Sequence, residues 1–95
     1  MTNDNKLTVK LFTKDRCVPC SALGFTFQMA EQQLDETGAE IVRYNIDNDP
    51  NLIGEYNLAS VPVTIVEKGG EEIKRYRGMF DIMQLVELLN VEGGR

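Results

Sequence analysis

The sequence predicts an α/β fold in which a four-stranded mixed sheet is flanked by three helices, in the order β-α-β-α-β-β-α. Three observations support this prediction. A strand-like segment near the start is followed by a helix-like segment and a second strand, two further strand-like segments are separated by paired glycines, and an apolar stripe of helical spacing lies near the end. Because 95 residues leave room for one such domain, we expect a single domain over residues 1–95 with its core at about 7–90.

The first half of the chain predicts a β-α-β unit. Within residues 6–13, apolar Leu7, Val9 and Leu11 alternate with Thr8, Lys10 and Phe12, which indicates a strand with distinguishable faces. A second strand is expected over Ile41 to Ile46, and the β-α-β order implies that the two strands pair in parallel. Between them, from Val18 to about Thr37, apolar residues recur at helical spacing: Leu23, Phe27, Ala30 and Leu34.

Two further helices are predicted from their start signals. Asp49 can cap free helix amides and Pro50 suits the first helical position, so a short helix is expected from here to about Asn57. Asp81 followed by Gln84 resembles a capping box, and an apolar helical stripe follows it, made of Ile82, Leu85, Val86 and Leu89. The ends of the chain, Met1 to Asn5 and Val91 to Arg95, are expected to fray.

A β-hairpin is predicted between these two helices. Its strands are expected over Val61 to Glu67 and over Glu72 to Arg77, and Lys68-Gly69-Gly70 supplies the turn because glycine readily adopts tight-turn conformations. Elsewhere, five large apolar side chains are expected in the core rather than in a functional site: Phe12, Phe25, Phe27, Met29 and Met83.

Composition and charge exclude several classes of function. Ten basic against fifteen acidic residues give a net charge of −5, which disfavours nucleic acids and anionic membranes as partners. The chain has no histidine, which excludes histidine-based catalysis and histidine metal ligands. No apolar run is long enough to span a bilayer, and residues 1–6 lack the apolar core of a signal peptide. We therefore expect a cytoplasmic protein.

The motif Cys17-Val18-Pro19-Cys20 lies where the first predicted strand ends and the first long helix begins. A cysteine at a helix start lies among unpaired backbone amides and the positive end of the helix dipole, and both favour the thiolate over the thiol. Cys17 is therefore the expected nucleophile. Lys14 and Arg16 add positive charge beside it, although ordinary solvated charge is an equally good interpretation of these two residues.

Cys20 follows one helical turn later and is expected to be the less exposed of the pair, as suits a resolving thiol. Val18 and Pro19 stand between the two sulfurs and should tune the redox potential, with proline stiffening the turn. The alternatives are an inert buried thiol pair or half of a metal site. Zinc requires about four ligands, whereas this motif supplies two, so we expect no metal and no cofactor beyond the Cys17–Cys20 disulfide.

A proline at the start of the third predicted strand, in Ser60-Val61-Pro62, is the second informative element. Proline is tolerated at the first position of a strand. Only about 5% of X-Pro bonds in folded proteins are cis, so the spacing alone predicts a trans bond.

The segment from Thr13 to Cys20 resembles the active-site segment of glutaredoxins and NrdH-redoxins. The later part of the chain is similar to thioredoxins, because residues 45–50, 56–62 and 68–71, followed by Gly78, match their pattern in order. The resemblance covers about Leu7 to Asn90. It implies a thioredoxin-like fold and a thiol-disulfide oxidoreductase, an electron carrier that reduces protein disulfides.

The resemblance also implies roles for residues outside the C-x-x-C motif. It makes the bond before Pro62 cis, places Pro62 against the cysteine pair, and lets the backbone of Val61 hydrogen-bond an extended stretch of the partner. Lys14, Val61 and Asp81 match three positions that glutaredoxins use to bind glutathione. Met79 and Phe80, beside Gly78, are expected near the rim of the site, where exposed apolar side chains suit docking of a protein partner.

Departures from both families leave the electron source open. Thioredoxins carry a buried acid at the position of Leu11, so proton transfer at Cys20 needs water or another group here. Thioredoxin reductase and glutathione are both candidate reductants. Val18 matches NrdH-redoxins, which adds ribonucleotide reductase as a candidate acceptor. We expect a monomer that acts on disulfide-containing proteins; the alternatives are a glutathione-dependent glutaredoxin and a non-catalytic interaction module of the same fold.

Overall fold

The computed structural model describes residues 5–94. The described chain forms these elements in order: β1 (Leu7–Thr13), α1 (Val18–Met29), α2 (Glu31–Glu36), β2 (Glu40–Asn45), α3 (Asn51–Glu55), β3 (Val63–Lys68), β4 (Glu71–Arg77) and α4 (Ile82–Glu92). Fraying was also expected at Met1 to Asn5 and at Arg95. Of these residues, 1–4 and 95 lie outside the described range. At the other end α4 remains helical through Glu92, so the fraying predicted from Val91 is wrong for its first two residues.

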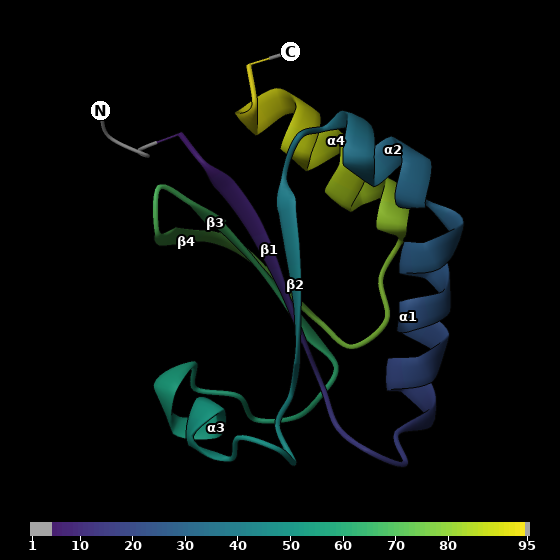
Figure 1. Cartoon of the computed structure of the whole chain (residues 1–95), viewed down its shortest axis with the longest axis vertical. Coiled ribbons are helices and arrows are strands. Elements are labelled where there is room, and N and C mark those ends of the chain that lie inside the picture. The colour runs from purple at the N-terminus through teal and green to yellow at the C-terminus, as the bar shows by residue number, and fades with distance from the viewer. Residues whose placement is uncertain (1–4, 95) are drawn as a thin grey trace.

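The four strands form one mixed sheet, as the sequence predicted, and their order in the sheet is β2-β1-β3-β4 (Figure 1). β1 pairs with β2 in parallel, which is what the β-α-β order requires. β1 pairs with β3 and β3 pairs with β4 in antiparallel fashion. The hairpin turn between β3 and β4 contains Gly69 and Gly70 at positive φ of 61° and 89°, a conformation that glycine adopts without steric cost.

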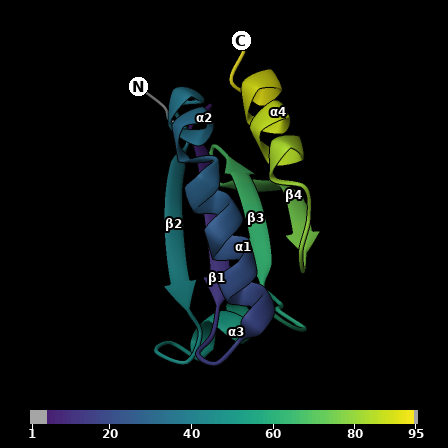
Figure 2. The ribbon, with the colours of Figure 1, turned by 90° about the vertical axis from the view of Figure 1, so that its right-hand side faces the viewer.

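The two faces of the sheet are covered by different helices. In Figures 1 and 2, α1, α2 and α4 lie on one side of the sheet and the short α3 lies on the other. The first side is a continuous apolar cluster: Leu7, Val9, Leu11, Leu23, Phe27, Ala30, Leu34, Val66, Leu85, Val86 and Leu89. The second is smaller and comprises Phe12, Leu52, Leu58, Val63 and Ile65. The central strand β1 therefore contributes buried residues to both faces.

The long helix predicted from Val18 to about Thr37 is divided in two, so residues 5–94 form four helices where three were predicted. At Ala30 the backbone leaves the helical region, with φ of −100° and ψ of 15°. In the last turns of α1 the Thr26 hydroxyl donates to the carbonyl of Leu23 at 2.7 Å, a side-chain bond that is known to bend helices. The predicted apolar stripe survives the break, because Ala30 and Leu34 remain buried.

Other local predictions were partly wrong. α3 begins at Asn51 with Pro50 as its N-cap, and no side-chain bond caps it, so Asp49 does not act as the cap. Phe12 and Phe27 are buried as expected, but three of the apolar residues expected in the core are exposed: Phe25, Met29 and Met83. These three lie on the outer faces of α1 and α4, where a helix leaves part of its circumference to solvent.

Candidate active site

Cys17 and Cys20 form a disulfide at the start of α1, with a Cα–Cα distance of 5.2 Å. Cys17 is the N-cap residue and has extended backbone, with φ of −122° and ψ of 101°. Pro19 lies in the first turn of α1, where proline fits because the first helical amides have no partner within the helix. The place of the motif, between the first strand and first helix, is as predicted.

Two backbone amides at the start of α1 donate hydrogen bonds to the first cysteine. The amide of Cys20 donates to the Cys17 sulfur at 3.2 Å, and the amide of Ser21 donates to the Cys17 carbonyl at 3.1 Å. An N-cap sulfur that accepts an amide bond at the positive end of a helix is better stabilised as a thiolate than as a thiol. Cys17 is 9% exposed and Cys20 5%, so the second cysteine is the more buried, whereas Val18 between them is 81% exposed.

The loop that precedes Cys17 is held by a polar network. The amide of Asp15 donates to a carboxylate oxygen of Asp47 at 2.9 Å, and the side-chain amide of Asn45 donates to the Asp15 carboxylate at 2.9 Å. The amide of Asp47 in turn donates to the side-chain oxygen of Asn45. The network ties the loop after β1 to the loop after β2. It thereby fixes the approach of the chain to Cys17.

Lys14 and Arg16 are exposed in this loop and line a shallow hollow together with Asp15 and Asp47. Arg16 has a positive φ of 53°, an uncommon conformation for a residue other than glycine. Positive and negative side chains alternate around the hollow, so Lys14 and Arg16 do not form an uninterrupted basic patch beside Cys17.

The bond between Val61 and Pro62 is cis. The trans bond predicted from spacing is therefore wrong, and the resemblance gave the correct isomer. Pro62 is buried and immediately precedes β3, whose first residue pairs with Phe12 of β1. The amide of Gly78, itself at a positive φ of 76°, donates to the Pro62 carbonyl at 2.8 Å. This hydrogen bond links the segment after β4 to Pro62.

Asp81, the remaining candidate, serves as the N-cap of α4. Its carboxylate accepts from the amide of Met83 at 3.0 Å, which is the structural role that its sequence position indicated. Of the two apolar residues expected near the rim, Met79 is 49% exposed. Phe80 is packed instead: its ring stacks on Tyr76 with centroids 4.1 Å apart and meets the edge of Phe27.

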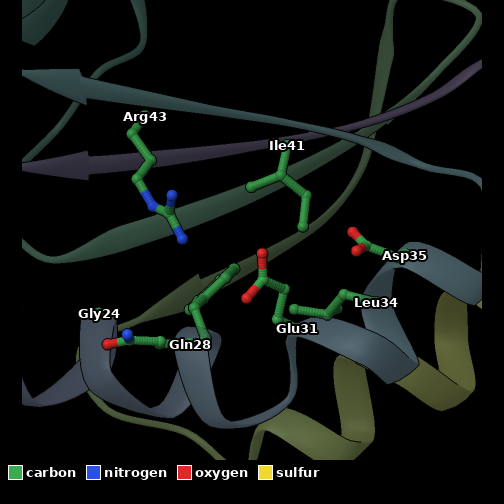
Figure 3. Close-up of a pocket in the computed structure, with 8 residues that line it drawn as sticks. Gly24, Gln28, Glu31, Leu34, Asp35, Ile41 and Arg43 are labelled. Atoms are coloured by element: carbon green, nitrogen blue, oxygen red, sulfur yellow. The ribbon is translucent and has the colours of Figure 1, made fainter.

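A separate hollow of about 410 Å³ lies between the α1–α2 segment and β2, away from the cysteine pair (Figure 3). Its lining includes Glu31 and Asp35 from α2 and Arg43 from β2. In Figure 3 the Arg43 side chain extends from β2 toward the side of the hollow that Glu31 and Gln28 line. No cysteine lines this hollow, so the redox-active disulfide lies outside it.

The sequence interpretation missed Asn45, Asp47 and Gly78 as parts of the site. A signal for the first two was present, since polar side chains that follow neighbouring parallel strands meet at one edge of a sheet. Within residues 5–94, no group of three potential ligands from His, Cys, Asp and Glu is placed to hold a metal ion. No helix in this range is long and apolar enough to cross a membrane.

Comparison with known proteins gives the family. The thioredoxin family model matches residues 1–91. Thioredoxin from Mycoplasma genitalium is 30% identical over 74 residues, which are 78% of this chain and 71% of that protein. Thioredoxin from Chlorobaculum thiosulfatiphilum is 32% identical over 78 residues, covering 80% of this chain and 69% of the relative.

Solved structures agree with the sequence comparisons. A mutant thioredoxin from Halobacterium salinarum superposes with a TM-score of 0.79 at 26% identity, covering 98% of this chain and 80% of that chain. Fasciola hepatica thioredoxin has the same fold, with a TM-score of 0.78. The chain therefore belongs to the thioredoxin family and is a thiol-disulfide oxidoreductase with a redox-active disulfide between Cys17 and Cys20.

Proposed function

We propose that Cys17 is the attacking thiolate and Cys20 the resolving thiol. Cys17 attacks one sulfur of a substrate disulfide, forming a mixed disulfide and releasing the other substrate sulfur as a thiolate. Cys20 then loses its proton and attacks the Cys17 sulfur, which releases the second substrate thiolate and closes the Cys17–Cys20 bond. The observation that carries this division is the 3.2 Å bond from the Cys20 amide to the Cys17 sulfur at the helix start.

The substrate is a protein disulfide, presented in an extended segment. Val61 and Pro62 would bind it, because they precede the ladder of β3 and the half-buried Val61 leaves its backbone at the end of the sheet. Val18, at 81% exposure, offers the apolar contact closest in sequence to Cys17. Arg16, Val18 and Pro19 tune the potential through charge and turn stiffness.

Thioredoxin reductase is the electron source that the family membership favours. The second candidate is glutathione, held by Lys14, Val61 and Asp81 as in glutaredoxins. The Asp81 carboxylate already caps α4 through Met83, which leaves it less free for a ligand. In this proposal the chain works as a cytoplasmic monomer, a single domain with its core at about residues 7–90. Ribonucleotide reductase, as for NrdH-redoxins, is a candidate acceptor.

Three proteins test the division of roles: the parent, Cys17→Ser and Cys20→Ser. In insulin reduction with dithiothreitol, the parent should turn over and both variants should be inactive. Only Cys20→Ser should accumulate a mixed disulfide with a substrate protein, detected by non-reducing electrophoresis. Trapping by Cys17→Ser instead would reverse the assignment, and no turnover by the parent with both thiols free would favour the non-catalytic interaction module.

The electron source is tested separately with the parent protein. We expect rapid reduction of the Cys17–Cys20 disulfide by thioredoxin reductase with NADPH, and slow reduction by glutathione at the same total reducing capacity. Reduction by glutathione alone would refute the reductase proposal and favour the glutaredoxin alternative. In that case Lys14→Ala should weaken the reaction with glutathione.

A further inference from the structure

Thr64, the second residue of β3, carries an unusual hydroxyl. The residue is 0% exposed, and its Oγ1 has no hydrogen-bond partner among the protein groups of residues 5–94. A buried hydroxyl without a partner costs stability, so native proteins rarely retain one. Valine has nearly the same shape and would avoid this cost. The retained hydroxyl therefore calls for a partner that the oxidised protein does not offer.

The sheet register places this hydroxyl on the face that α1 covers. Thr64 pairs with Leu11 on one side and with Tyr76 on the other. Leu11 belongs to the apolar cluster that α1 packs against, and side chains directly opposite each other in a sheet point to the same face. The Leu11 side chain offers no polar atom to the hydroxyl.

The direction of the chain brings Thr64 toward the cysteine end of α1. β1 runs to the end of the sheet at which α1 begins, and α1 runs back along the sheet (Figures 1 and 2). β3 starts at that same end, immediately after Pro62, so Thr64 lies two residues after this proline. The buried side of α1 begins with Cys20 and continues with Leu23, about 4.5 Å further along the helix axis at 1.5 Å per residue. Cys20 is thus the buried residue of α1 closest to the first residues of β3.

We propose that Thr64 is a positioning residue for Cys20, and that its hydroxyl donates a hydrogen bond to the Cys20 sulfur when the disulfide is reduced. The inference rests on the thiol-disulfide exchange proposed above. In the oxidised protein this sulfur is bonded to that of Cys17, and a disulfide sulfur is a weak acceptor. After reduction it is a thiol or thiolate, and hydrogen bonds to an ionised acceptor are the strong ones. Thr64 therefore stabilises the reduced form more than the oxidised form.

The experiment compares Thr64→Val, which removes the hydroxyl, with Thr64→Ser, which keeps it. The equilibrium constant between the dithiol and disulfide forms is measured in buffers of oxidised and reduced dithiothreitol, by counting alkylated thiols. We expect Thr64→Val to shift this constant about tenfold toward the disulfide, which lowers the potential by about 30 mV. Thr64→Ser should stay within about twofold of the parent.

Thr37→Val is the matched control. Thr37 is also buried, at 4% exposure, but its hydroxyl is satisfied by the Leu34 carbonyl and the Ala39 amide at the end of α2. This variant should lose stability without any shift in the redox equilibrium. Thr64→Val should shift the redox equilibrium. It should not lower the stability of the oxidised form, because that form loses only an unpaired hydroxyl.

Two results would overturn the proposal: a Thr64→Val constant within about twofold of the parent, or a Thr64→Ser constant shifted as far as that of Thr64→Val. The second result would assign the effect to packing. Neither reductase nor protein substrate takes part, so this outcome is independent of the electron source. A parent protein without any dithiol–disulfide equilibrium would instead contradict the proposed function itself.

Discussion

The two faces of the sheet differ in whether they carry largely buried charged side chains. The face under α1 and α4 is apolar around the cysteine end, and Thr64 is the buried polar residue there. The face under α3 carries an ion pair between Lys10 and Glu67, whose side chains are only 17% and 14% exposed. Lys10 also donates to the hydroxyl of Tyr56 at 2.8 Å. Neighbouring residues of one strand, Lys10 and Leu11, thus lie in opposite environments.

Because of this difference, we expect changes on the α3 face to alter stability and to leave the redox chemistry at Cys17 and Cys20 unchanged. A charge beside the cysteine pair would alter the balance between thiolate and thiol, because electrostatic effects are large where water is excluded. Charges on the α3 face lie beyond a layer of backbone from the cysteines and act mainly on folding. Phe12→Ala tests whether the α3 face can be changed without changing the exchange at Cys17 and Cys20, and variants of Lys10 and Glu72 measure what the charges on this face and at its edge contribute to folding.

The largest effect is expected from Phe12→Ala on the α3 face. Phe12 is 0% exposed and lies between two tyrosine rings, with centroids 5.1 Å from that of Tyr44 and 4.8 Å from that of Tyr56. Its truncation should lower the free energy of unfolding by about 3–5 kcal/mol, because a cavity remains among the rings. Urea denaturation of the oxidised protein measures this loss.

Two controls accompany Phe12→Ala. Phe25→Ala makes the same chemical change at a side chain that is 60% exposed, and should cost less than about 0.5 kcal/mol. The dithiol–disulfide equilibrium of Phe12→Ala, measured where the variant is folded, should stay within about twofold of the parent. A tenfold shift would show that the two faces are coupled and would remove the separation argued above.

Lys10→Met is expected to have an intermediate effect. It leaves the Glu67 carboxylate without its partner in a largely buried position, and should cost about 2 kcal/mol, between the ~1 kcal/mol of exposed pairs and the 3–5 kcal/mol of fully buried ones. The double variant Lys10→Met with Glu67→Leu should recover most of this loss, because no unpaired charge remains. Unfolding of the single and double variants measures the coupling. A double variant as unstable as the single one would contradict the ion-pair explanation.

The pH dependence of this pair has a definite sign. Burial disfavours the charge on Lys10, but its bonds to Tyr56 and Glu67 outweigh burial and raise its pKa above the ordinary 10.5. A raised pKa contributes stability that is fully present below the unfolded value and is lost as pH rises through the folded value. The stability difference between parent and Lys10→Met should therefore be constant from about pH 7 to pH 10.

The sequence predicted the site better than its surroundings, for physical reasons. Cys17 and Cys20 lie within one helical turn, and the strand and helix beside them have clear periodicity, so local signals were sufficient. The break at Ala30 depends on a single residue's backbone angles, which periodicity does not report. Lys10 and Tyr56 are 46 positions apart, and their contact is set by the docking of α3 on the sheet. That the Thr64 hydroxyl is buried without a hydrogen-bond partner is likewise visible only in the assembled sheet.

The smallest effect is expected from Glu72→Gln at the edge of the sheet. The side-chain hydrogen bond from Arg75, at 2.8 Å, lowers the pKa of Glu72 below its usual 4.5, but the carboxylate side chain is 40% exposed. An exposed pair contributes only about 0.2–1 kcal/mol. Because the pKa is lowered, this contribution is present above pH 4.5 and is lost as pH falls through the folded value.

Unfolding of Glu72→Gln and the parent between pH 3 and pH 7 measures this contribution, with Glu71→Gln at the exposed neighbouring position as the control. The difference between parent and Glu72→Gln should shrink toward zero at the acid end, and Glu71→Gln should cost less stability than Glu72→Gln at pH 7. Arg75 also donates to the carbonyl of Asn57, at 3.3 Å, just beyond α3. A loss well above 1 kcal/mol would therefore mean that Glu72 holds Arg75 in place to fasten the α3 segment. The α3 face would then depend on its rim as well as on the ion pair at its centre.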